Sequence, residues 1–174
     1  MVNDFVRNLI YFVLFVLIQV LFLNHIYFLR LATPFLYLYF LLKLPNGMAR
    51  SRMLFLAFFT GLTIDAFTNT PGMHAAACTL VGFIREPLIQ FLTGKDLPEG
   101  VYPSFRSFGY GGFFRYSLTL VAIHHLVLFG IESLSLFDPL FLILRIVGSV
   151  GMTTLLVFAV EAFNVESQRS GEKP

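Results

Sequence analysis

The sequence predicts an all-α integral membrane protein with six transmembrane helices, and three observations lead to this prediction. Only 13% of the 174 residues are charged and 57% are hydrophobic, whereas an average soluble domain carries about 25% charged residues. The charged residues are clustered, and the uncharged runs between the clusters have the length of membrane spans. Lys and Arg fall almost entirely on one predicted side of the membrane. These observations disfavour a soluble enzyme, a disordered chain and a nucleic-acid binder.

The uncharged runs mark the expected helices. The longest run, 8–29, has 22 residues and can by itself cross a bilayer core of about 30 Å. Runs of 19, 16 and 15 residues, at 66–84, 116–131 and 146–160, suffice once polar residues near their ends reach the interface. Two runs of 12 residues, 31–42 and 53–64, flank three cations that would be costly at membrane depth, so we interpret them as two short or tilted spans rather than a re-entrant hairpin. The predicted helices are 8–29, 32–44, 53–68, 72–93, 113–134 and 138–163.

The distribution of Lys and Arg predicts the orientation. Ten of the 12 fall on the side of the two termini, whereas Arg30 lies on the opposite side and Arg145 within the last helix. The ten are Arg7, Lys43, Arg50, Arg52, Arg85, Lys95, Arg106, Arg115, Arg169 and Lys173. Because cytoplasmic loops carry the excess of Lys and Arg, both termini are expected in the cytoplasm. We expect one membrane domain over 1–163, a Pro- and Gly-rich cytoplasmic loop over 94–112, and a polar cytoplasmic tail over 164–174.

Small residues recur at helical spacing in the fourth and sixth predicted helices. Small side chains let helix backbones approach closely. The fourth helix carries Ala75, Cys78, Thr79 and Gly82, and the sixth carries Gly148, Ser149, Gly151 and Thr153. The pattern predicts packing within the bundle, with a docking groove for a partner helix as the alternative, and nothing in the sequence separates the two.

Several polar residues interrupt the apolar pattern and form a predicted intramembrane polar cluster. Asp65 ends the third helix, Glu132 ends the fifth, and Arg145 lies roughly 10 Å below the outer end of the sixth. An unpaired Arg at this depth is costly, so we hypothesise that Arg145 pairs with Glu132 or Asp65 and joins the three helices. A proton or ligand relay is the alternative. His124 and His125, in the fifth helix, are expected to make interhelical hydrogen bonds.

Motifs for catalysis or metal binding are missing from the sequence. There is no Gly-x-Ser-x-Gly elbow and no HExxH motif, and the single Cys78 excludes a multi-cysteine metal site. Adjacent residues on a helix point about 100° apart, so His124 and His125 are poorly placed to chelate one ion, and His74 is the one further histidine expected at membrane depth. We therefore expect a non-enzymatic protein without a metal or another cofactor.

Residues 61–74 read GLTIDAFTNTPGMH, and this segment resembles the signature of the rod shape-determining protein MreD family. That signature has Gly-x-x-x-Asp at a helix end, a short outer loop with Pro and Gly, and then a helix rich in small residues. Gly61, Asp65, Pro71 and Gly72 match it. Many members have a Leu between the Pro and the Gly, which this sequence lacks. Gln19, Pro34 and the six predicted spans also fit the family.

The resemblance implies a non-enzymatic component of the bacterial cell-elongation complex in the inner membrane. Proteins of the MreD family bind MreC, which has a single membrane helix. They help organise MreB filaments, a RodA-type glycosyltransferase and a class B penicillin-binding protein during peptidoglycan synthesis. The family is similar in fold to the substrate-binding subunits of energy-coupling-factor vitamin transporters, which supplies the alternative function. A vitamin-binding subunit is expected to enclose a polar cavity under its outer loops, whereas a scaffold is expected to fill that volume with apolar and aromatic side chains.

Overall fold

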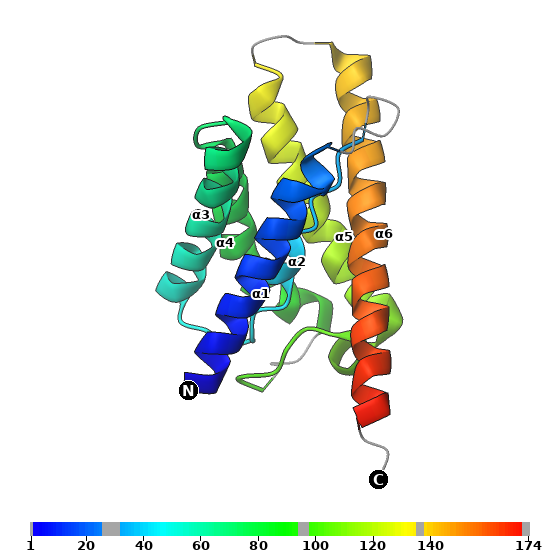
Figure 1. Cartoon of the computed structure of the whole chain (residues 1–174). Helices are drawn as coiled ribbons and strands as arrows, with labels where there is room; N and C mark the ends of the chain where they lie inside the picture. The colour runs from blue at the N-terminus through cyan, green and yellow to red at the C-terminus, as the bar shows by residue number, and fades with distance from the viewer. Residues whose placement is uncertain (1, 26–31, 94–97, 135–137, 172–174) are drawn as a thin grey trace.

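The computed structural model describes residues 2–25, 32–93, 98–134 and 138–171, and the elements of its fold over these ranges are helices joined by non-helical connections (Figure 1). Its α-helices are α1 (Val2–Leu21), α2 (Leu38–Leu42), α3 (Arg50–Thr68), α4 (Met73–Thr93), α5 (Phe105–Glu132) and α6 (Pro139–Gly171). A short 3-10 helix, η1 (Leu23–His25), follows α1. The predicted helix 8–29 is therefore α1 with η1, and its last residues, 26–29, lie outside the described ranges.

The long helices run side by side as a bundle. From α3 to α6, each helix packs against the next helix in the chain, and α1 packs against α3 and α2. Both termini lie at one end, which is the lower end in Figure 1, together with the connection between α2 and α3 and residues 98–104. We call this the terminal end. The α3–α4 turn and the end of α5 lie at the opposite, far end.

Three helices are long and apolar enough to cross a membrane, which indicates a membrane protein. Among the described residues these candidate spans are Met73–Leu92, Phe105–Glu132 and Pro139–Asn164, with a shorter apolar stretch at Asn8–Leu21. The bundle also presents large apolar side chains on its outside: Phe91 and Phe163 expose 82% and 74% of their surface. Such a surface is unfavourable in water and is well placed against lipid.

The predicted helix 32–44 is wrong over most of its length. Only Leu38–Leu42 is helical, and residues 32–37, which we call the buried connector, run as non-helical chain through the interior. Side chains from two helices satisfy its backbone. Thr33 N donates to Ser149 Oγ at 3.0 Å, and Phe35 N donates to Thr153 Oγ1 at 3.0 Å.

Gln19 of α1 completes this arrangement. Its Oε1 accepts from Leu36 N at 2.8 Å, while its Nε2 donates to Pro34 O at 3.0 Å. Non-helical backbone at membrane depth is tolerated where it is buried in protein and its polar groups are bonded. The polar side chains of α1 and α6 therefore replace the bonds that a helix would have supplied.

The fifth helix begins eight residues earlier than predicted, so the expected loop 94–112 is too long. Ser104 caps α5: its Oγ accepts from Ser107 N at 3.2 Å, and Ser107 Oγ accepts from Ser104 N at 2.9 Å. Phe105 is buried against Phe113 and Phe158. Gly109, with φ 68° and ψ 168°, bends the helix in a conformation that is essentially restricted to glycine. The capping box and the buried ring stabilise the added turn.

The boundaries of the third and fourth helices lie close to the predictions. The predicted helices 53–68 and 72–93 correspond to α3 and α4. The last predicted helix, 138–163, is shorter than α6, whose backbone stays helical to Gly171 through most of the expected polar tail. Residues 172–174 lie outside the described ranges.

Candidate functional site

The four residues that carry the family resemblance build the turn between α3 and α4. At Gly61 the two helices touch: a Cβ there would lie 2.4 Å from His74 O and 2.5 Å from the Cα of Ala75. Neither backbone could accept a side chain at this distance. Pro71 is exposed in the turn, and Gly72 has a φ of 85°, which favours glycine. The Gly61 position and the turn glycine together allow the close helical hairpin.

Asp65 holds the start of α4 in place. Its side chain is 3% exposed and accepts three hydrogen bonds of 2.9 Å, from Thr70 Oγ1, His74 N and Ala75 N. The first N–H groups of a helix have no partner within that helix, and a carboxylate there also interacts favourably with the helix dipole. Asp65 therefore caps α4 from the neighbouring helix. The spacing of Gly61 and Asp65, one helical turn apart, brings both to the α4 N-terminus.

The packing predicted for the small residues on α4 is present, while docking of a partner helix stays a prediction. Ala75 and Cys78 are buried, and a Cβ at Gly82 would lie 2.9 Å from Ala57 Cβ of α3, so these residues pack within the bundle. Thr79 instead lines an open apolar groove between α3 and α4, which we call the α3–α4 groove. Its lining consists of Leu54, Phe58, Gly72, Ala75, Ala76, Thr79, Leu80 and Phe83.

The small residues of α6 pack against the buried connector. Ser149 and Thr153 are fully buried and accept hydrogen bonds from two N–H groups of the connector. A Cβ at Gly148 would lie 3.3 Å from Ala32 Cβ. The prediction that Gly151 packs against another helix is wrong, because a Cβ there would have no heavy atom of the described residues within 4 Å. It faces outward since the inward positions of this stretch are 149 and 153, one helical turn apart.

The ion pair predicted for Arg145 is formed with Glu132. Arg145 Nη1 lies 2.9 Å from Glu132 Oε1, and the guanidinium lies 4.4 Å from the centre of the Phe129 ring. The pair joins α5 to α6 near the far end. Asp65 does not share it, because its carboxylate is bound at the start of α4, so the predicted link of three helices is wrong. Asp65 accepts hydrogen bonds from the α3–α4 turn and the start of α4 instead of pairing with Arg145.

The two histidines of α5 belong to a separate buried network. The Tyr37 hydroxyl lies 2.7 Å from His74 Nδ1 and 2.8 Å from His124 Nε2, and thus joins α4 to α5. His125 Nδ1 lies 2.7 Å from Val121 O, and its Nε2 lies 3.3 Å from Thr153 Oγ1 of α6. The interhelical hydrogen bond predicted for His125 is therefore present, with Thr153 of α6, whereas His124 bonds to Tyr37 of the buried connector. Among the described residues, no three His, Cys, Asp or Glu side chains are grouped to hold a metal ion.

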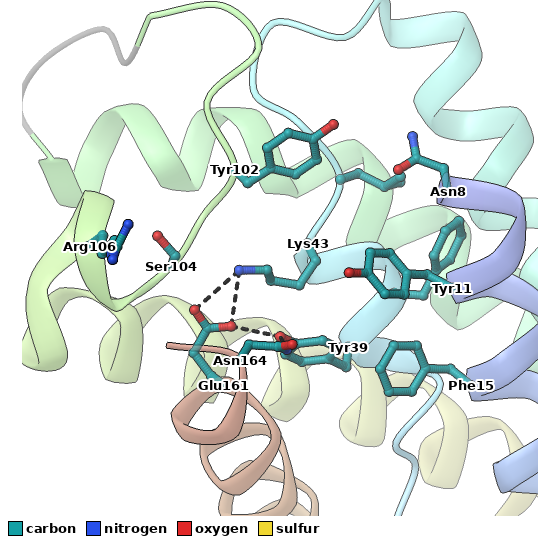
Figure 2. A pocket seen from close by; sticks show the side chains of 12 residues that line it. Asn8, Tyr11, Phe15, Tyr39, Lys43, Tyr102, Ser104, Arg106, Glu161 and Asn164 are labelled. Atoms are coloured by element: carbon teal, nitrogen blue, oxygen red, sulfur yellow. Dashed lines mark hydrogen bonds and ion pairs between the residues drawn. The ribbon is translucent and has the colours of Figure 1, made fainter. Parts of the chain in front are cut away.

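A buried charged cluster at the terminal end was missed by the sequence interpretation. Glu161 of α6 is 1% exposed; Lys43 Nζ lies 3.0 Å from its Oε2, and the Tyr39 hydroxyl donates to the same oxygen at 2.7 Å (Figure 2). Asn164 Nδ2 donates to the Tyr39 hydroxyl at 2.7 Å. A carboxylate at the end of an uncharged run is costly without a partner, and this signal could have drawn attention to Glu161. Its partners lie 118 and 122 residues away along the chain.

Arg85 was counted among the cytoplasmic cations, but it is fully buried inside the bundle. Its Nε donates to the Tyr116 hydroxyl at 3.1 Å, its Nη1 lies 3.0 Å from Glu86 Oε1, and its Nη2 donates to Leu44 O. The Tyr116 hydroxyl in turn donates to Leu42 O at 3.0 Å. Arg85 and Tyr116 therefore satisfy carbonyl groups at the end of α2, which a helix of five residues leaves open.

Comparison with protein-family models, curated proteins and solved structures gives no match for this chain. The described site residues are engaged in holding helices together. The hollowed surfaces of the described part of the chain include the α3–α4 groove and a cavity beside Glu161 at the terminal end, and both offer room for another molecule.

Proposed function

We propose that this protein is a non-enzymatic scaffold of the bacterial inner membrane, an MreD-like component of the cell-elongation complex that binds an MreC-like protein. The observation that carries the proposal is the α3–α4 hairpin. Gly61, Asp65, Pro71 and Gly72 resemble the family signature; Gly61, Asp65 and Gly72 each have a defined role in this hairpin, and Pro71 lies exposed in its turn. We further propose six spans with both termini in the cytoplasm, supported by the distribution of Lys and Arg.

The α3–α4 groove is the surface proposed for the partner. Part of it follows α4, one of the helices long and apolar enough to cross a membrane, so an occupant there has to be apolar at membrane depth. Ala76 and Thr79 are small and permit close approach of a second helix, while Phe58 and Phe83 provide apolar surface beside them. A single membrane helix, such as the one of MreC-like proteins, fits this chemistry.

Aromatic packing supports a scaffold over a vitamin-binding subunit of an energy-coupling-factor transporter. Phe35 of the buried connector contacts the rings of Tyr37, His74, His124, His125 and Phe129. Its side chain thus occupies the space between α4 and α5 toward the far end, where such a subunit needs room for its ligand. The alternative predicts that a vitamin remains bound through purification.

Co-purification tests the proposed function. The protein is expressed with a tagged MreC-like protein from the same bacterium, extracted in mild detergent and captured through the tag. We expect the wild-type chain to be retained. Absence of retention, together with a vitamin found in the purified chain, would replace this proposal by the transporter subunit.

A pair of matched variants tests the groove. Ala76→Phe places a ring in the α3–α4 groove, and we expect it to reduce retention about tenfold, because a bulky side chain blocks close helix approach. Ala66→Phe is the control: Ala66 is also exposed, lies on α3 and does not line the groove. Equal retention of both variants would show that the partner binds elsewhere on the bundle.

A further inference from the structure

The cavity beside Glu161, which we call the terminal cavity, has a volume of about 280 Å³ and is lined by residues of α1, α2, α5 and α6 (Figure 2). Ligand pockets in proteins measure about 300–1,000 Å³, so this one has the size for a single small ring. The α3–α4 groove shares no lining residue with it. An occupant of the terminal cavity is therefore independent of the partner proposed for that groove.

The charged side chains of the lining are already engaged. Lys43 Nζ lies 3.2 and 3.0 Å from the two oxygens of Glu161. Glu161 also accepts from the Tyr39 hydroxyl and from Phe105 N, and Arg106 is engaged in another interaction of the chain. The Lys43–Glu161 pair presents both signs of charge, so a charged occupant would lose its hydration without a matching gain in attraction. The lining therefore favours an uncharged occupant.

One amide on the wall has its orientation fixed by the neighbouring bonds. The Tyr39 hydroxyl donates its single proton to Glu161 Oε2 at 2.7 Å, so its oxygen accepts from Asn164. The part of the Asn164 amide that faces Tyr39 is therefore its NH₂ group. Asn164 Oδ1 is left as an acceptor, and it has no partner among the described residues.

Other groups of the lining have unused hydrogen-bonding capacity. The Lys43 ammonium has three N–H donors, and its hydrogen-bond acceptors within the described chain are the two oxygens of Glu161. The Asn8 amide and the Tyr11 hydroxyl have no hydrogen-bond partner among the described residues, and each can both donate and accept. A phosphate or carboxylate only accepts and an ammonium group only donates, whereas a hydroxyl group does both. The lining therefore matches a ligand with several hydroxyl groups.

The wall formed by α1 adds an aromatic surface to these polar groups. Asn8, Tyr11 and Phe15 follow one another at spacings of three and four residues, so they share one face of the helix. Tyr11 is 41% exposed, and its ring lies 6.4 Å from that of Phe15. The face of an aromatic ring carries partial negative charge and attracts the weakly positive C–H groups of a saturated ring. This wall suits a ring with C–H groups on its face and hydroxyl groups on its edge.

We propose that the terminal cavity binds an uncharged sugar ring. Its hydroxyl groups bond to Asn8, Lys43 and Asn164, and its C–H face lies against Tyr11. The ring comes either from a free sugar or from the headgroup of a glycolipid. Leu14, next to the α1 wall, exposes 46% of its surface and offers an apolar path for the chain of a glycolipid.

Binding is measured on the full chain by native mass spectrometry and thermal shift, in a polyoxyethylene detergent, whose headgroup is not a sugar. The probes are glucose and galactose, their octyl β-glycosides, octyl phosphate and octyltrimethylammonium. We expect at least one sugar to be retained and to raise the unfolding midpoint, and the two charged amphiphiles to bind at least tenfold more weakly.

The comparison of the probes also separates the two sources of the ring. A free sugar that binds as tightly as its octyl glycoside assigns the site to soluble sugars, and binding of the glycoside alone assigns it to a glycolipid headgroup. The proposal is wrong if a charged amphiphile binds as tightly as the octyl glycosides, or if no sugar probe is retained.

Two pairs of variants locate the site. Asn8→Leu removes an amide without a partner among the described residues, so we expect an unchanged fold and about tenfold weaker sugar binding. Gln90→Leu is its control, because Gln90 is an exposed amide on α4, outside the cavity and equally without a partner in the described chain. Tyr11→Phe keeps the ring and is expected to weaken binding about fivefold. Its control is Tyr110→Phe, an exposed phenol that does not line the cavity. If neither cavity variant loses more binding than its control, the sugar does not occupy the terminal cavity.

Discussion

Gly61 shows how one hydrogen atom in place of a side chain sets the distance between two helices. A Cβ at this position would lie 2.4 Å from a carbonyl oxygen and 2.5 Å from a Cα, both of which belong to backbone rather than to a movable side chain. We predict that Gly61→Ala separates α3 from α4 and costs about 1–3 kcal/mol of stability. The measurement is the thermal unfolding midpoint of the purified protein in detergent.

Gly151→Ala is the control for this prediction. Gly151 is also helical, but a Cβ there would meet nothing within 4 Å of the described chain. Alanine favours the helix over glycine by about 0.5–1 kcal/mol, so this variant is expected to be as stable as the wild type or slightly more stable. If the two variants unfold at the same temperature, the contact at Gly61 does not limit the packing of α3 on α4.

Asp65 provides the second prediction at the scale of single residues. Asp65→Ala removes the acceptor of His74 N and Ala75 N, and each buried donor left without a partner costs about 1–3 kcal/mol. Asp65→Asn keeps one oxygen and is expected to fall between the wild type and the alanine variant. The thermal midpoints of the three proteins test this order. An alanine variant as stable as the wild type would refute the capping role.

Among the elements, the buried connector depends most on distant side chains. Thr153→Val keeps the shape of the side chain but removes the acceptor of Phe35 N and the contact with His125 Nε2. We predict a loss of about 1–3 kcal/mol, measured as a lower unfolding midpoint, because the N–H group stays buried without a bond.

Thr63→Val is the matched control for Thr153→Val. The Thr63 hydroxyl donates to Phe59 O of its own helix at 2.7 Å. This carbonyl also accepts the backbone hydrogen bond of the helix, so loss of the hydroxyl leaves it with a partner. We expect a change below about 0.5 kcal/mol, as at surface positions generally. A loss equal to that of Thr153→Val would indicate that removal of a threonine hydroxyl is harmful wherever it occurs.

The same element explains where sequence-based prediction of the fold fails. The two helices that flank Asn69–Gly72 were predicted closely, because charges and turn residues mark their ends locally. The buried connector is apolar and reads as a helix, and its actual conformation depends on Ser149 and Thr153, 116 and 118 residues away. A local sequence pattern cannot indicate a hydrogen bond between residues so far apart in the chain. The start of α5 was missed because its glycines indicated a loop, whereas Gly109 forms a bend within a helix.

For the candidate sites, prediction succeeded where one residue limited the choice of partners. Arg145 at depth required a carboxylate, and Glu132 was one of two candidates. Asp65 was placed in the same cluster because its position at the helix end indicates a similar depth in the membrane. The sequence does not indicate which neighbouring helix its side chain faces. The Glu161 cluster and the terminal cavity assemble from α1, α2, α5 and α6. Their existence depends on how the helices are arranged, which the order of residues does not reveal.

The orientation of the whole molecule yields the fourth prediction. The endogenous Cys78 is buried, so it is not expected to react with a membrane-impermeant maleimide. Pro71→Cys introduces a thiol at the far end and Arg52→Cys one at the terminal end, and both positions are exposed. We expect labelling of position 71 from the periplasmic side in osmotically shocked cells, and labelling of position 52 only after the inner membrane is permeabilised. The reverse pattern would overturn the orientation derived from Lys and Arg.

The buried connector also has a consequence for how the protein is made. Two of its N–H groups find their acceptors on α6, which the ribosome completes more than a hundred residues after the connector has been synthesised. At about 5–20 residues per second, this delay lasts at least about 6 s. During that time residues 32–37 need other partners, such as water, a transient helix or the insertion machinery. The native path of the chain is therefore reached only after the last helix has entered the bundle, so a nascent chain arrested before Ser149 cannot form it.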